Sequence, residues 1–70
     1  MADERYNRIR VAMAEHERSN KWLAEKLGKS GTTVSRWITN KSQPSIEQLY
    51  EIAKALNVDV RELLEPSHEQ

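Results

Sequence analysis

The chain has 70 residues and a mass of 8.2 kDa, which suits one domain and leaves little volume for a large cleft. Hydrophobic residues make up 37% and charged residues 31%, and 11 basic residues balance 11 acidic ones, so no overall charge drives binding. The lack of cysteine excludes disulfides and thiolate metal sites. No apolar run approaches the roughly 20 residues that span a bilayer, and residues 1–6 lack the apolar stretch of a signal peptide. We therefore expect a small soluble intracellular domain.

The balanced total hides an uneven distribution of charge. Residues 1–42 carry a net charge of +4, and residues 43–70 carry −4. Between Glu25 and Glu47 every charged residue is basic, namely Lys26, Lys29, Arg36 and Lys41. This pattern is consistent with one anion-facing side, although an unevenly charged solvated surface explains it equally well.

Apolar residues recur at three- to four-residue spacing, which predicts helices rather than strands. The first predicted helix runs from about Asp3 to Glu17. The second runs from Asn20 to Leu27, between a cap at Ser19 and a stop at Gly28. The inward face of the first helix would carry Tyr6, Ile9, Ala12 or Met13, and His16.

Two further helices follow. The third is capped by Ser30 and ends at Asn40, a residue type that tolerates the left-handed backbone conformation. The fourth begins with a capping box formed by Ser45 and Gln48 and ends at Asn57. Its apolar stripe comprises Ile46, Leu49, Ala53 and Leu56, with Ile52 beside it.

A short fifth helix is predicted after Asp59, whose spacing to Glu62 repeats that of a capping box, and Pro66 would stop it. The expected fold is therefore a compact all-α arrangement of five helices. It forms a single domain over residues 1–70, with its core at about residues 6–65 and a flexible tail over residues 66–70.

The most informative stretch is residues 20–39, where a turn of three residues, 28–30, joins two short helices. Ala24 and Gly28 are small enough for the helices to cross steeply. Such a helix-turn-helix presents its second helix outward to a groove. The inward side chains would be Leu23, Leu27, Val34 and Trp37, and the outward face would carry Gly31, Thr32, Ser35 and Arg36.

On the segments 23–28, 30–37, 40–45 and 52–58, the sequence resembles the Cro and phage-repressor type of helix-turn-helix domain, the XRE family. The resemblance extends without gaps over roughly residues 6–65. It implies a lambda-repressor-like fold whose third helix enters the DNA major groove. The implied base-contacting residues are Gly31, Thr32, Ser35 and Arg36, and the implied phosphate-contacting residues are Asn20, Ser30, Thr33, Lys41 and Ser42.

The sequence also departs from the family pattern. Asn20 stands where glutamine is usual, and Lys29 replaces an apolar turn residue. Residues 38–40, Ile-Thr-Asn, replace the common Glu-Asn-Gly. Arg18 and Met13 are likewise unusual. These changes bear on specificity and on individual backbone contacts rather than on the fold.

Each singled-out residue also has a plainer interpretation. Arg36 could be a solvated helix residue, Ser30 is first of all a cap, and Lys26 suits a solvated outer face. Trp37 is expected in the core. Trp22 should be partly exposed while packing against its neighbours.

No set of residues suggests catalysis, since a Ser-His-Asp arrangement and a phosphate-cradling glycine loop are both lacking. His16 and Glu17 begin like a zinc-protease motif, but Asn20 stands where the second histidine is required. We expect no enzyme activity, no cofactor, no metal and no small-molecule ligand.

The sequence and its resemblance to the XRE family therefore predict a sequence-specific regulator that binds double-stranded DNA. It would be of bacterial or phage type and would act in the cytoplasm, at the nucleoid. It would be a homodimeric repressor on a palindromic operator. Val60, Leu63, Leu64 and Tyr50 could form a self-association face or instead close the core. The alternatives are an antitoxin or other protein-interaction module, bound to a protein partner such as a toxin, and the DNA-binding domain of a longer regulator.

Overall fold

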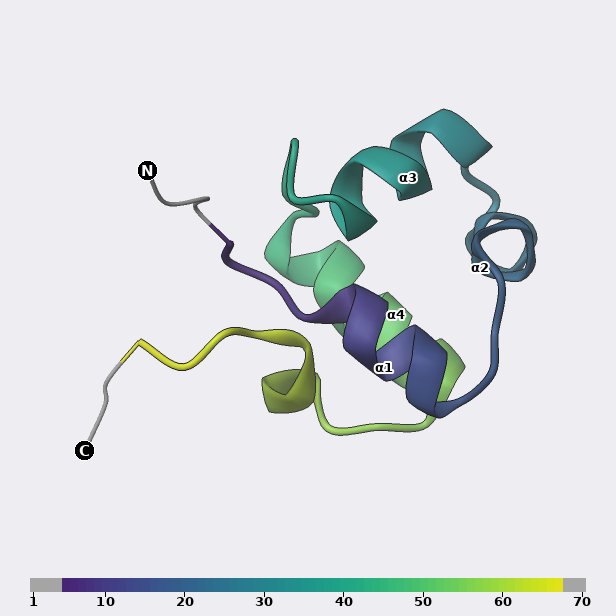
Figure 1. The fold of residues 1–70 in the computed structure, drawn as a ribbon. Helices are drawn as coiled ribbons and strands as arrows, with labels where there is room; N and C mark the ends of the chain where they lie inside the picture. Colours follow the sequence, from purple (N-terminus) through teal and green to yellow (C-terminus); the bar gives the residue numbers. More distant parts are fainter. Residues whose placement is uncertain (1–4, 68–70) are drawn as a thin grey trace.

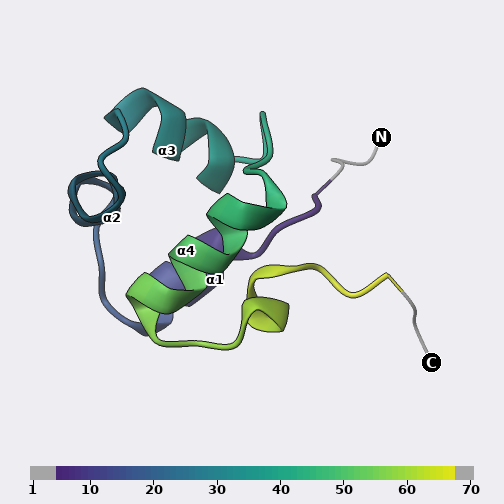
Figure 2. The ribbon, with the colours of Figure 1, turned by 180° about the vertical axis from the view of Figure 1, so that it is seen from behind.

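The computed structural model describes residues 5–67. In this part of the chain the elements are α1 (Ile9–Glu15), α2 (Asn20–Leu27), α3 (Gly31–Ile38), α4 (Ile46–Leu56) and a single 3-10 turn, η1 (Val60–Leu63). Helix α1 lies in front of α4 in Figure 1 and behind it in the reverse view of Figure 2, and α2 and α3 lie to one side of this pair. The all-α fold is confirmed.

The core takes one completely buried large side chain from every element. These side chains are Ile9, Leu23, Val34, Ile52 and Leu63, from α1, α2, α3, α4 and η1 respectively. Smaller or less central residues fill in around them: Ala12, Met13, Ala24, Trp37, Ile38, Leu49, Ala53 and Leu56. No element therefore has a core of its own, and each is held by the others.

The predicted helix ends in the middle of the chain are confirmed. The hydroxyls of Ser19, Ser30 and Ser45 each accept a backbone amide at the start of α2, α3 and α4. Ser45 and Gln48 form the predicted reciprocal capping box. Gly28, Asn40 and Asn57 have φ values of 68°, 62° and 60°, so each stops its helix in the left-handed conformation.

The first helix is shorter than predicted. It begins at Ile9, because the side-chain oxygen of Asn7 accepts the Ile9 amide at 3.1 Å and the preceding residue, Arg8, has a non-helical backbone with φ of −116° and ψ of 35°. The backbone of residues 6–8 is used elsewhere: Arg8 N donates to Leu63 O, and Glu65 N donates to Tyr6 O. Tyr6 is therefore an exposed residue and not part of an inward helical face.

The helix also ends early, at Glu15, so that His16 follows it as its C-cap. Glu17 then takes a left-handed backbone with φ of 54°. Asp3, at the start of the predicted helix, lies outside the described residues.

The fifth element is a 3-10 turn rather than an α-helix, so the fold has four α-helices and one such turn among the described residues. The Asp59 carboxylate accepts the Arg61 amide at 2.8 Å and pairs with its guanidinium, instead of forming a capping box with Glu62. Hydrogen bonds from Arg61 lower the pKa of Asp59, and those bonds raise the pKa of Arg61. Of the predicted tail, Pro66 and Ser67 are exposed, and residues 68–70 lie outside the described residues.

Two predictions about the stripe of the fourth helix need correction. Ile46 is 69% exposed, because it lies in the first turn of α4, one turn before the buried Leu49. Ile52, which the sequence placed beside the stripe, is completely buried at its centre. The inward face of α4 is therefore formed by Leu49, Ile52, Ala53 and Leu56.

The core assignment predicts a large difference between two apolar truncations. Leu23→Ala should lower the free energy of unfolding by about 2–5 kcal/mol, because it leaves a cavity at a completely buried position. A core of this size rarely supplies more than about 3–5 kcal/mol, so the variant should be largely unfolded at room temperature. Ile46→Ala is the control, and this exposed truncation should cost less than about 0.5 kcal/mol. Urea denaturation followed by circular dichroism measures both, and equal losses would contradict the assigned core.

Candidate nucleic-acid interface

The connection between α2 and α3 has the geometry of a helix-turn-helix. Gly28 ends α2 in the left-handed conformation, and the Lys29 amide returns to Ala24 O at 2.9 Å. Ser30 then starts α3 at once. In Figure 1 α2 is seen almost down its axis while α3 lies across the view, so the two helices cross steeply. The small, buried Ala24 lies on the packed side of α2, as the crossing requires.

Helix α3 separates its side chains into two faces. Val34, Trp37 and Ile38 are buried in the core, which confirms the predicted position of Trp37. All four residues predicted to contact bases are exposed, namely Gly31, Thr32, Ser35 and Arg36. The space where Gly31 would carry a Cβ is open, so packing within the chain does not require a glycine there. The exposed face therefore combines short side chains with one arginine.

The first turn of α3 uses two of the predicted phosphate-contacting residues for its own cap. The Ser30 hydroxyl accepts the Thr33 amide at 3.1 Å and donates to the Thr33 hydroxyl oxygen at 2.9 Å. Thr33 is half-buried. The amides of Gly31 and Thr32 remain at the helix N-terminus, where no intrahelical acceptor exists for them and where the helix dipole favours anions.

The loop after α3 folds back onto its last turn. The carbonyl oxygen of Arg36 accepts the amides of Lys41 and Ser42 at 2.9 and 3.2 Å. Two more of the predicted phosphate-contacting residues therefore lie beside the backbone of Arg36. Lys41 is exposed and Ser42 is half-buried.

Asn20 stands apart from this group. It is the exposed first residue of α2, next to the Ser19 cap. No side-chain hydrogen bond within residues 5–67 links it to α3 or to the loop after it. Hydrogen bonds thus connect Ser30 to the start of α3, and Lys41 and Ser42 to its end. The position of Asn20 relative to these residues depends only on how α2 packs.

One residue that the sequence analysis missed is Asn7. It is 3% exposed, and its side-chain amide donates to Trp37 O at 2.9 Å and to the Gln43 side-chain oxygen at 2.8 Å. These bonds connect the segment directly before α1 to the end of α3 and to the loop that follows it. The apolar spacing around residues 6–9 gave no signal for this, because an asparagine between Tyr6 and an apolar Ile9 looks like a solvated helix residue.

Trp22 packs as expected. Its ring is half-buried against the core, and the Arg18 guanidinium lies 4.5 Å from the ring centroid. This distance is that of a cation–π contact. The contact gives a physical reason for the unusual arginine at position 18.

The helix-turn-helix and the loop after it carry several exposed basic residues. Lys26, Lys29, Arg36 and Lys41 are exposed, and no acidic residue occurs between positions 26 and 46. Within the described residues, no group of three potential metal ligands comes together. None of the helices in that part of the chain has the length and apolar character needed to cross a membrane.

Comparison with known proteins agrees with this geometry. A family model described as helix-turn-helix matches residues 9–63, from the first residue of α1 to the last residue of η1. The chain belongs to the XRE family of helix-turn-helix domains.

This XRE-family domain is also similar to a crystal structure of a candidate DNA-binding protein from Bacteroides fragilis. The two chains are 53% identical and superpose with a TM-score of 0.85, over 89% of this chain and 100% of the other. No curated protein matches the sequence.

The cap of α3 can be tested without DNA. Ser30→Ala should lower the free energy of unfolding by about 1 kcal/mol, because the Thr33 amide loses its acceptor. Ser35→Ala, at an exposed position inside the same helix, is the matched control and should cause no loss, since alanine is the better helix former. Urea denaturation compares the two, and a loss at Ser35 as large as at Ser30 would argue against the capping role.

Proposed function

We propose that this XRE-family domain is a sequence-specific regulator that binds double-stranded DNA by placing α3 in the major groove. The observation that carries the proposal is the exposed face of α3, which offers short side chains and one arginine beside a positively charged loop. A helix with such a face can approach base edges closely while the flanking cations neutralise phosphates. The likeness to the Bacteroides fragilis protein supports the same function.

The base-contacting roles follow from side-chain chemistry. Arg36 can make the bidentate contact to guanine, which discriminates against other bases by about 1–3 kcal/mol. Thr32 can place its methyl group against that of thymine or its hydroxyl on a base edge, and Ser35 can donate to or accept from either. Gly31 has no side chain and permits close approach.

Phosphate contacts would supply most of the affinity. The exposed cation of Lys41 and the hydroxyl of Ser42 lie at the end of α3, and the Gly31 and Thr32 amides lie at its start. Ser30 and Thr33 would contribute hydroxyl oxygens already held by the cap, and Asn20 would add a contact from α2. Binding of this kind weakens steeply as salt rises.

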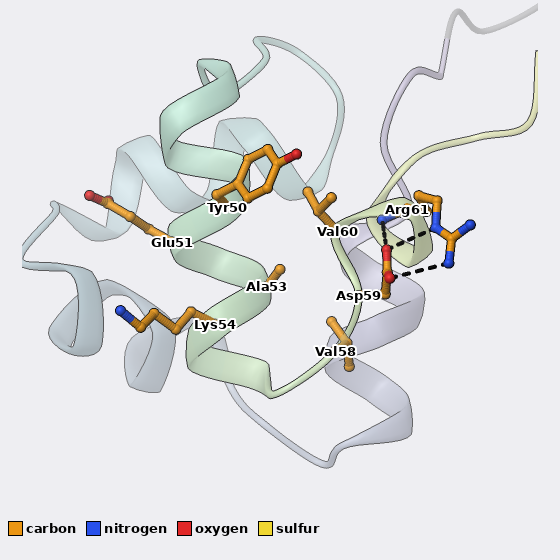
Figure 3. Close-up of a pocket in the computed structure, with 8 residues that line it drawn as sticks. All are labelled: Tyr50, Glu51, Ala53, Lys54, Val58, Asp59, Val60 and Arg61. Carbon is orange, nitrogen blue, oxygen red and sulfur yellow. Dashed lines mark hydrogen bonds and ion pairs between the residues drawn. The ribbon is translucent and has the colours of Figure 1, made fainter.

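The regulator would act as a homodimer on a palindromic operator and repress transcription in the cytoplasm, at the nucleoid of a bacterium or of a phage-infected cell. One recognition helix in one groove buries little surface, whereas two copies about 34 Å apart double the contacts. Exposed apolar residues that could meet a second copy are present in α4 and directly after η1: Tyr50 is 61% exposed and Leu64 is 41% exposed. Figure 3 shows an open groove between α4 and η1, lined by Tyr50, Ala53, Val58 and Val60 and flanked by the Asp59–Arg61 pair.

The same groove favours one alternative function, that of a protein-interaction module such as an antitoxin. A toxin segment could occupy the groove while α3 still binds DNA. Leu63, which the sequence analysis offered for a self-association face, is completely buried and is not available for either contact.

Selection of bound sequences from a random duplex pool at physiological salt tests the proposal directly. We expect enrichment of a palindrome whose half-sites lie about one helical turn apart. Enrichment of a single half-site would refute the dimer while retaining the sequence-specific regulator. No enrichment would contradict sequence-specific binding and favour the protein-interaction module.

Arg36→Ala should relax base preference at one position of each half-site and cost about 1–3 kcal/mol per half-site on the selected sequence. Arg36→Lys is the matched comparison, because it keeps the charge and removes the planar two-donor group. We expect it to retain affinity for random DNA and to lose the same base preference. Titrations on selected and random duplexes measure these differences, and equal losses on both by Arg36→Ala would rule out base contact by Arg36.

Lys41→Ala should weaken binding to all sequences by a similar factor and reduce the salt slope of the binding constant by about one per subunit. The control is Lys54→Ala, which removes an exposed lysine from the groove side of α4. Its salt slope should equal that of the unmodified protein. An unchanged slope for Lys41→Ala would show that Lys41 does not meet a phosphate.

A further inference from the structure

Asn40 and the backbone of residues 6–7 are joined by a set of hydrogen bonds. The Asn40 side-chain oxygen accepts the amides of Tyr6 and Asn7 at 2.9 and 3.0 Å. Its side-chain nitrogen donates to Asn7 O at 3.2 Å. The Asn40 side chain therefore pairs with the extended chain as a neighbouring strand would.

The side chain of Asn7 completes the connection in the other direction. It donates to Trp37 O and to the side-chain oxygen of Gln43, and the Gln43 amide nitrogen donates back to the Asn40 side-chain oxygen at 3.1 Å. Asn7, Gln43 and Asn40 thus form a closed ring of hydrogen bonds, in which Gln43 joins the two asparagine side chains and the Asn40 side chain joins the backbone of Asn7. We call this set of three residues the amide ring.

Two members of the amide ring, Asn40 and Gln43, lie at the two ends of the loop segment that carries the proposed phosphate contacts. Lys41 and Ser42 lie between Asn40 and Gln43, and the amides of both go to Arg36 O. Every residue from 40 to 43 is consequently fixed by a side-chain or backbone hydrogen bond. The ammonium group of Lys41 takes no part in the ring, and the residue is exposed.

The residue type at position 40 is informative because the backbone there is left-handed, a conformation that glycine adopts most easily. Glycine would satisfy the φ of 62° at least as well as asparagine. It would not supply the oxygen that accepts three hydrogen bonds or the nitrogen that donates a fourth. The left-handed turn therefore does not by itself explain the asparagine, whereas the amide ring does.

We propose that Asn7 and Asn40 are positioning residues for DNA binding, whose amide ring holds residues 40–43 in the conformation that presents Lys41 and Ser42 to phosphates. A loop fixed in advance loses little conformational entropy on binding, and a loose loop must be ordered at that moment. This inference rests on the proposed function, since it assigns a role within the same DNA interface.

Asn40→Gly is the decisive variant, because it keeps the backbone conformation and removes the whole side chain from the ring. We expect its affinity to fall about five- to tenfold, by the same factor on the selected operator and on random duplex, with base preference unchanged. Asn57→Gly is the matched control. Asn57 has φ of 60° at the end of α4, so the same exchange tests the backbone effect away from the loop. Its affinity should stay within about twofold of the unmodified protein.

A second measurement without DNA separates the possible failures. In Asn40→Gly, the amide protons of Lys41 and Ser42 should exchange with solvent faster relative to those of the α3 core residues than in the unmodified protein. Unchanged exchange of these amides would overturn the positioning role whatever the DNA result.

Faster exchange with unchanged affinity would also overturn the inference, since a loose loop would then bind as well as a fixed one. A loss of base preference would overturn it too, because it would mean that α3 itself had moved. If the unmodified protein binds no duplex, the proposed function fails and the inference fails with it. That outcome is recognised from the unmodified protein and from Lys41→Ala, before Asn40→Gly is considered.

Discussion

The side chain of Asn7 is almost entirely buried, and a buried amide is costly unless its donors and acceptor find partners inside the protein. Here the partners are the amide that begins α1, the carbonyl of Trp37 near the end of α3, and the Gln43 side chain in the next loop. Satisfying one amide therefore fixes three parts of the chain at once. The backbone around it also bonds to Leu63 and Glu65, so the C-terminal segment is held at the same place.

The local features of the fold could be predicted because local chemistry determines them. Serine caps at positions 19, 30 and 45 and left-handed stops at positions 28, 40 and 57 depend only on neighbouring residues. The buried face of α3 follows from helical periodicity. For the same reason, the sequence was enough to predict that Gly31, Thr32, Ser35 and Arg36 share an exposed face.

What the sequence did not predict depends on residues distant in the chain. The start of α1 is set by the Asn7 side chain, and residues 6–8 are held in place by bonds to residues 40, 63 and 65; periodicity carries no information about such distant pairs. The exposure of Ile46 and the burial of Ile52 depend on which elements cover α4. The role of the Asn40 side chain is a further case, because sequence alone explains a left-handed asparagine by its backbone.

The shared core has a consequence for the motions of α3, the helix proposed to enter the DNA groove. Since every element contributes one completely buried large side chain to a single core cluster, α3 cannot detach without exposing the core residues of α1 and α2, on which it packs. Opening of α3 and unfolding of the whole domain should then be a single event, with little population of partly open states. In the proposed complex, α3 would meet DNA as a rigid body, and its adjustments would be confined to side-chain rotations and to the loops at its two ends.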